Sequence, residues 1–142
     1  MVGTEEDAAR AYRGEMLVLN PNPHGDRTVY RDPGSATVYK VDKPERRHRQ
    51  ANAREHANAE LFAECLGVPP TSLYAVDEDV VLAMPYCPYP LAESEEGDEI
   101  KAALDRHFGP DLHAQNMRKD AADKVWFIDL VDRRPNRAAV SD

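Results

Sequence analysis

The stretch DLHAQNMRKDAADKVWFID, residues 111–129, sets polar residues at fixed steps around a predicted β-hairpin. Its aspartate-rich centre, DAAD, favours a turn, and the apolar run KVWFI after it favours a strand. We therefore expect two strands, at residues 116–119 and 124–128, with DAAD as the turn between them. Such a hairpin brings the side chains of Asn116 and Asp129 to the same end, side by side.

The polar residues of this stretch have a chemistry in common. The amide oxygen of Asn116 and the carboxylate of Asp129 are ligands that Mg²⁺ takes in proteins. Asp111 lies on the loop before the hairpin, within reach of whatever the cation holds. Phosphoryl transfer needs these parts, a metal ion on the phosphates and a carboxylate that takes or orients the proton of the acceptor hydroxyl. The pattern therefore favours Asn116 and Asp129 as metal ligands and Asp111 as the catalytic group.

The order D-x4-N and then a strand-terminal aspartate resembles the catalytic and metal-binding loops of the protein-kinase-like superfamily. The form DLHxxN is more similar to aminoglycoside and choline phosphotransferases than to protein kinases, which usually carry lysine where this chain has His113. The chain departs from the family at Gly109, where histidine is expected, and after Asp129, where Leu130 and Val131 replace Phe-Gly. The resemblance implies ATP and Mg²⁺ as cofactors and a hydroxyl acceptor on a protein or a small molecule.

The length, charge and cysteine content limit the class of protein. The 142 residues predict one domain, and the net charge of −8 argues against a general nucleic-acid binder. Cys65 and Cys87 are too few for a disulfide framework, which indicates a reducing cytoplasm. The longest apolar runs, such as VVLAM, are far too short to span a membrane, and the acidic N-terminus lacks the apolar region of a signal peptide.

Upstream of the hairpin, the sequence predicts an α+β fold. A short helix is expected at residues 5–12, with Thr4 as a possible cap. Alternating apolar residues and turn signals such as DPGS predict five antiparallel strands. These strands are expected at residues 16–20, 27–31, 36–41, 72–76 and 80–84. One long helix, roughly residues 45–66 and with a possible bend near its middle, lies between the third and fourth strands and would pack on the sheet.

A lysine in the third strand and a glutamate on the long helix form the next candidate pair. On a helical wheel Glu55 falls inside the apolar stripe, Glu64 on its edge and Glu60 farther out. A buried glutamate needs a partner, and Lys40 in V-Y-K-V could be one. The simpler alternative is that Lys40 and all three glutamates are solvated. The segment REHANAELFAECLGVPP also resembles the E…L…LGVPxP segment of aminoglycoside phosphotransferases, which implies Glu55 as partner of a phosphate-contacting Lys40, with Glu60 as substitute.

Two further segments take nucleotide-binding roles if the resemblance holds. The loop NPNPHGD would cover the phosphates, although it has one glycine, Gly25, and its prolines remove amide donors. Met84-Pro85-Tyr86-Cys87 would form the hinge that pairs with the adenine ring. Pro85 has no N–H, so the Cys87 amide and neighbouring carbonyls would serve. The implied nucleotide-binding residues are Gly25, Lys40, Glu55, Met84, Tyr86 and Cys87.

The resemblance covers residues 16–129 and only the nucleotide-handling half of the family's fold. It implies a single minimal domain, with a small lobe at residues 1–84, a hinge at 85–90 and a reduced second lobe at 91–142. The reduced lobe would hold one helix, residues 99–108, and the hairpin, and its exposed apolar surface would be covered by the chain's tail or by a homodimer. The alternative function is an inactive kinase-like module that works by binding a protein partner.

A basic cluster at the start of the long helix has two interpretations. Its members are Arg46, Arg47, His48, Arg49 and Arg54. The first interpretation is a solvated face with i,i+4 ion pairs. The functional alternative is a docking surface for an acidic partner or a phosphate-bearing substrate.

Overall fold

Five antiparallel strands form the sheet at the centre of the fold. They are β1 (Leu17–Val18), β2 (Arg27–Arg31), β3 (Thr37–Asp42), β4 (Ser72–Val76) and β5 (Asp79–Pro85). In the sheet they lie in the order β1-β2-β3-β5-β4. The computed structural model describes residues 1–19, 25–61, 68–90, 102, 117–120 and 124–127. The α+β class and the five-stranded antiparallel sheet agree with the sequence prediction.

The predicted strand bounds hold best where turn signals flank the strand on both sides. The bounds of β2 and β4 agree with the prediction to the residue. Of the predicted strand MLVLN, β1 pairs Leu17 with Arg31 and Val18 with Tyr30, and the Leu19 N–H also donates to the Val29 oxygen at 2.8 Å. Asn20 lies outside the described residues. Strand β5 is one residue longer at each end than predicted, since it pairs with β3 over residues 81–85 and with β4 over residues 79–83.

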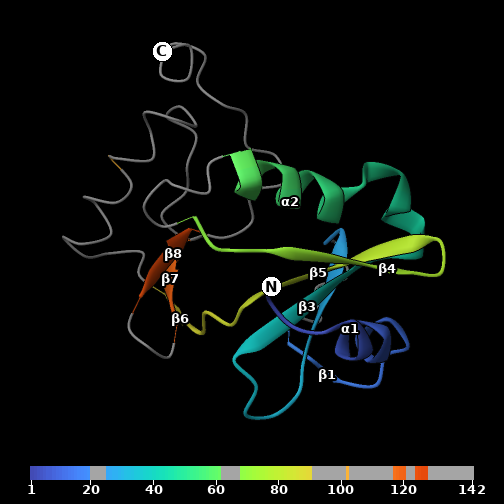
Figure 1. Cartoon of the computed structure of the whole chain (residues 1–142), viewed down its shortest axis with the longest axis horizontal. Coiled ribbons are helices and arrows are strands. Elements are labelled where there is room, and N and C mark those ends of the chain that lie inside the picture. Colours follow the sequence, from blue (N-terminus) through green and yellow to red (C-terminus); the bar gives the residue numbers. More distant parts are fainter. Residues whose placement is uncertain (20–24, 62–67, 91–101, 103–116, 121–123, 128–142) are drawn as a thin grey trace.

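The helices α1 (Glu5–Tyr12) and α2 (Ala51–Leu61) lie on opposite faces of this sheet (Figure 1). Side chains alternate between the two faces along each strand. Tyr39 on β3 packs in a buried core with Ala8 and Ala11 of α1. Its neighbours Val38 and Lys40 lie on the other face, toward α2. The sequence predicts α1 to the residue, but not that it covers the second face of the sheet.

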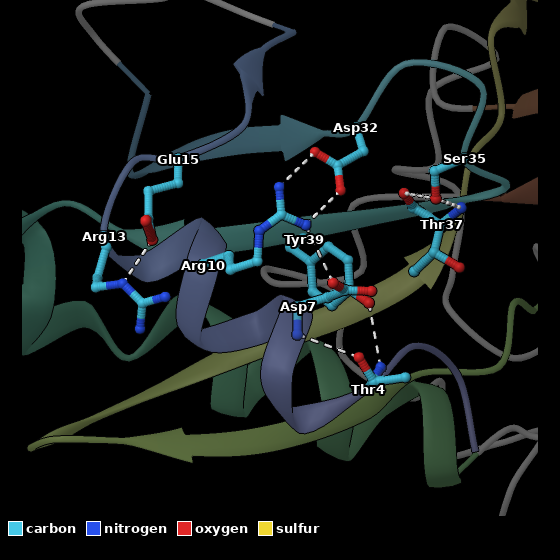
Figure 2. A network of polar contacts seen from close by, with 9 residues as sticks. All are labelled: Thr4, Asp7, Arg10, Arg13, Glu15, Asp32, Ser35, Thr37 and Tyr39. Carbon is cyan, nitrogen blue, oxygen red and sulfur yellow. Dashed lines mark hydrogen bonds and ion pairs between the residues drawn. The ribbon is translucent and has the colours of Figure 1, made fainter.

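A polar network fixes α1 to the sheet (Figure 2). The Thr4 hydroxyl accepts a hydrogen bond from the Asp7 N–H at 3.1 Å, which confirms the predicted cap. The Arg10 guanidinium donates to both carboxylate oxygens of Asp32, at 2.6 and 3.1 Å. These hydrogen bonds lower the pKa of the Asp32 carboxyl. The Tyr39 hydroxyl accepts from the Thr4 N–H at 3.1 Å, so β3 also holds the start of the helix.

The helical stretch predicted for residues 45–66 is divided near its start, at Gln50, and not near its middle. Pro44–Arg49 form a 3-10 helix, η1, and α2 begins at Ala51. Between them Gln50 adopts a left-handed conformation with φ 50°, which turns the chain out of a continuous helix. Like charges at helical spacing within the run RRHR disfavour a regular α-helix there. Residues 62–66 of the predicted helix lie outside the described residues.

A second, smaller sheet contains the predicted hairpin. Its strands are β6 (Tyr89–Pro90), β7 (Met117–Lys119) and β8 (Val125–Phe127), in the order β6-β7-β8. The hairpin β7–β8 confirms the expected strand pair, with Arg118 opposite Trp126. Asp120 closes it, because its carboxylate accepts from the Lys124 N–H at 3.0 Å and from the Trp126 indole N–H at 2.9 Å. The sequence does not predict β6, which is only two residues long.

Several predictions fall on residues that the structure does not describe. They include the helix at residues 99–108 apart from residue 102, the catalytic Asp111 and the metal ligands Asn116 and Asp129. Their placement therefore stays a prediction, as does a homodimer that would cover the reduced lobe. Within the described residues, no helix has both the length and the apolar character needed to cross a bilayer.

Candidate functional site

A buried ion pair joins the sheet to α2. Lys40 Nζ on β3 lies 3.1 Å from Glu55 Oε1 and 3.4 Å from Glu55 Oε2 on α2. The Lys40 side chain is 5 % exposed and the Glu55 side chain is fully buried. The alternative partner, Glu60, is 72 % exposed, and its carboxylate lies 3.1 Å from His56 Nε2. Glu55 is therefore the partner of Lys40, and the interpretation of these two side chains as solvated is wrong.

The local sequence explains how two charges become buried here. Lys40 lies on the same face of β3 as Val38 and Asp42, which are two residues before and after it, and all three are buried. On α2, the buried residues four positions before and after Glu55 are alanines, Ala51 and Ala59. Small side chains let the helix approach the strands closely. The Glu55 side chain then spans the short gap to Lys40.

Asn52 connects α2 to two strands of the sheet. Its side-chain amide donates to the backbone oxygen of Lys40 at 2.7 Å and to that of Val80 at 2.9 Å. Asn52 is fully buried, so these hydrogen bonds satisfy an amide that water cannot reach. Asn52 lies one turn before Glu55 on α2. Its hydrogen bond to the Lys40 oxygen therefore fixes the position of the helix along β3.

Arg27 is a third member of the cluster, which sequence reasoning missed. Its Nη1 atom lies 2.5 Å from Glu55 Oε1 and 3.2 Å from the side-chain oxygen of Asn52, and its side chain is 9 % exposed. Arg27 lies opposite Asp42 and Val29 opposite Lys40 in the β2–β3 ladder, so Arg27 is a diagonal neighbour of Lys40. This strand register is what places Arg27 in the cluster, and the register cannot be read from the sequence pattern alone.

Asp42 adds a buried carboxyl to the same layer. Its Oδ1 atom has no hydrogen-bond partner among the described residues, and the carboxyl accepts the backbone N–H of Asn52 at the start of α2. Burial raises the pKa of the Asp42 carboxyl, although the Asn52 N–H and the charge of Arg27 oppose this shift. The residues Arg27, Lys40, Asp42, Asn52 and Glu55, here called the α2-face cluster, form a polar layer between sheet and helix.

The residues of the predicted hinge extend from the end of β5. Met84 is 2 % exposed, lies opposite Val38 and shares a buried cluster with it. The Tyr86 N–H donates to the Ala36 oxygen at 2.8 Å, and the Tyr86 ring centroid lies 3.9 Å from the Arg31 guanidinium carbon. Its amide is thus engaged in extending the sheet.

The last two predicted nucleotide-binding residues lie at different places. Cys87 is buried and its thiol lies 3.4 Å from the Pro85 oxygen, which fits a packing role. Gly25 is partly exposed and leads through Asp26 into β2. The structure therefore pairs Lys40 with Glu55. It places Met84 beside Val38, on the face of the sheet that also carries Lys40. Asp111, Asn116 and Asp129 lie outside the described residues.

The basic cluster at the start of the helical stretch has partners on the sheet side. Arg47 lies 2.8 Å from Asp79 at the start of β5, and Arg49 lies 3.3 Å from Asp26 before β2. Arg54 donates to the Arg49 backbone oxygen at 2.9 Å. Arg47 and Arg49 thus each form an ion pair with an acidic residue of another segment. These arginines stabilise η1 and the start of α2 against the sheet.

Comparison with models of known protein families gives no match, and comparison with curated proteins gives none. The function must therefore be argued from the described side chains and the sequence motifs. Of these, the buried pair of Lys40 and Glu55 is the feature whose chemistry is most specific.

Proposed function

We propose that this chain is a kinase-like phosphotransferase that transfers the γ-phosphate of ATP to a hydroxyl group on a protein or a small molecule. The observation that carries the proposal is the ion pair between Lys40 on β3 and Glu55 on the next α-helix. Protein kinases require such a pair, in which the strand lysine binds nucleotide phosphates and the helix glutamate holds the lysine. The five-stranded antiparallel sheet with α2 against it is the setting that this resemblance implies.

The nucleotide would lie against the α2-facing side of the sheet. Lys40 would contact its phosphates, and Glu55 would hold the Lys40 ammonium in place. Gly25 would lie near the phosphates, because it comes just before β2. The adenine ring would lie at the end of β5, near Met84, Tyr86 and Cys87.

The catalytic step would use the residues of the DLHxxN motif. The acceptor hydroxyl oxygen forms a bond to the γ-phosphorus while the bond from that phosphorus to the β–γ bridging oxygen breaks. ADP leaves with the electron pair of the broken bond, and the hydroxyl proton passes to Asp111. Asn116 and Asp129 offer amide and carboxylate oxygens, a donor set that fits Mg²⁺, and the bound ion would neutralise phosphate charge.

Phosphate transfer from γ-labelled ATP tests this proposal. Hydrolysis of ATP and labelling of the chain itself are readouts that need no known acceptor. We expect Asp111→Asn and Asp129→Asn each to lower the rate by about a hundredfold or more. Asp77→Asn is the matched control, because Asp77 is exposed in the turn between β4 and β5 and its left-handed conformation suits asparagine. Equal rates in all four proteins would refute these assignments.

A second candidate is an inactive kinase-like module that binds a protein partner. The burial of Lys40 and Glu55 favours it, because a buried cluster that also engages Arg27 can serve to attach α2 to the sheet. Thermal unfolding with and without millimolar ATP and Mg²⁺ separates the two candidates. A ligand that binds only the folded state raises the melting temperature. A rise supports nucleotide binding, which the phosphotransferase requires, and an unchanged melting temperature favours the inactive module.

A further inference from the structure

We infer that Arg27 is a second phosphate-contacting residue of the nucleotide site, acting beside Lys40 and selecting nucleoside di- and triphosphates. This inference rests on the proposed function. Both cations contact the same atom, Glu55 Oε1, Arg27 through Nη1 at 2.5 Å and Lys40 through Nζ at 3.1 Å. Their nitrogens therefore lie within a few ångströms of each other. Adjacent phosphoryl groups of a nucleotide present anionic oxygens at a comparable spacing.

Arg27 is held in this place by more than Glu55. The side-chain oxygen of Asn52 accepts from Arg27 Nη1 at 3.2 Å, while the Asn52 amide donates to backbone oxygens of β3 and β5. The guanidinium is thus fixed relative to both strands and α2. A group held in position before the ligand arrives loses little conformational entropy on binding.

The position of Arg27 in the chain suits a phosphate contact. Arg27 is the first residue of β2, directly after the segment NPNPHGD. Pro21 and Pro23 in that segment have no N–H, so they cannot supply the amide donors that cradle phosphate in glycine-rich loops. A guanidinium supplies several N–H donors in a planar fork that matches phosphate oxygens. Arg27 would therefore compensate for the missing backbone donors.

Of Arg27, Lys40 and Glu55, Arg27 has the side chain most exposed to solvent. Its side chain is 9 % exposed, against 5 % for Lys40 and none for Glu55. Glu55 keeps the two cations together, and the phosphates would share them.

The test compares the affinities of ATP, ADP and adenosine, each with Mg²⁺, by isothermal titration calorimetry. For Arg27→Gln we expect ATP and ADP to bind about tenfold more weakly or worse, with the adenosine affinity within about twofold of wild type. Arg27→Lys keeps the positive charge but loses the planar fork of N–H donors, so its ATP affinity should lie between those of wild type and Arg27→Gln. Arg10→Gln is the matched control, because it removes an equal charge from an ion pair on the other face of the sheet.

The ratio of ATP to adenosine affinity separates a phosphate contact from a structural role. A purely structural Arg27 would weaken both ligands alike, or neither, and that result would overturn the inference while the proposed function stands. If the wild-type chain binds ATP no better than adenosine, the proposed function itself fails. If Arg27→Gln does not fold, as judged by circular dichroism, an unchanged ATP to adenosine ratio in Arg27→Lys would equally overturn the inference.

Discussion

The two faces of the five-stranded sheet are covered by helices in different ways. Against the alanines of α1 the sheet presents two tyrosines, a valine and an alanine, and the charged pair of Arg10 and Asp32 is partly exposed. Against α2 the sheet buries charged groups, with Lys40 and Asp42 on β3 facing Glu55 on the helix. Ordinary packing explains the first face. The second pays a desolvation cost that apolar side chains of the same size would avoid, which points to a function.

The largest expected effect comes from removing the carboxylate at the centre of the α2-face cluster. Glu55→Gln leaves Lys40 and Arg27 without the negative charge that both contact. We expect a loss of about 3–5 kcal/mol in the free energy of unfolding, measured by urea denaturation. Glu60→Gln is the matched control on the same helix, because Glu60 is 72 % exposed, and its loss should be much smaller. Equal losses in the two variants would show that the buried Glu55 carboxylate contributes no more to the free energy of unfolding than the exposed Glu60 carboxylate does.

The two faces should also respond to pH in opposite ways. The pKa of Asp42 is raised by burial, so its protonated form favours the folded state. That contribution is complete below the ordinary aspartate value of 3.8 and is lost as the pH rises through the higher folded value. The pKa of Asp32 is lowered by its hydrogen bonds from Arg10, so its contribution is present above 3.8 and is lost as the pH falls through the lower folded value.

We expect melting temperatures of Asp42→Asn and Asp32→Asn, measured from about pH 2.5 to about pH 7, to show these opposite responses. This range spans the ordinary aspartate pKa of about 4. Relative to wild type, Asp42→Asn should gain stability as the pH rises, because it lacks the buried carboxyl that ionises. Asp32→Asn should lose stability relative to wild type over the same rise. Parallel profiles for the two variants would mean that the faces do not differ in their electrostatics.

The smallest expected effect is on the α1 face. Thr4→Ala removes the hydroxyl that accepts the Asp7 N–H at the start of α1. We expect a loss of about 1 kcal/mol in the free energy of unfolding, without a change in nucleotide affinity. Thr4→Ser keeps the acceptor and should restore the lost stability. A Thr4→Ser variant as unstable as Thr4→Ala would show that the cap contributes little.

The α1 face and most of the sheet could be predicted from sequence, because their signals are local. Thr4 before an alanine-rich helix marked the start of α1, and alternating residues between turn signals marked β2 and β4. The burial of Glu55 could also be read from its place in the apolar stripe of the helix.

The parts that were missed depend on contacts between distant segments. Arg27 joins Glu55 only because β2 pairs with β3 in one particular register, and no pattern within β2 indicates it. The break at Gln50 depends on how η1 and α2 each attach to the sheet, through Arg47 and through Asn52. Strand β6 has two residues, which is too short for any alternation to show.

The proposed function requires that the α2 face binds nucleotide phosphates at Lys40. An ATP analogue with an acyl group on its terminal phosphate tests it directly, because a lysine amine beside the phosphates attacks the acyl carbonyl, forms an amide and releases ATP. Mass spectrometry then locates the acylated lysine. The account predicts acylation of Lys40 that excess ATP with Mg²⁺ suppresses, while any acylation of the exposed Lys124 is unaffected by ATP. An unmodified Lys40, or modification of Lys40 that ATP does not suppress, would contradict it.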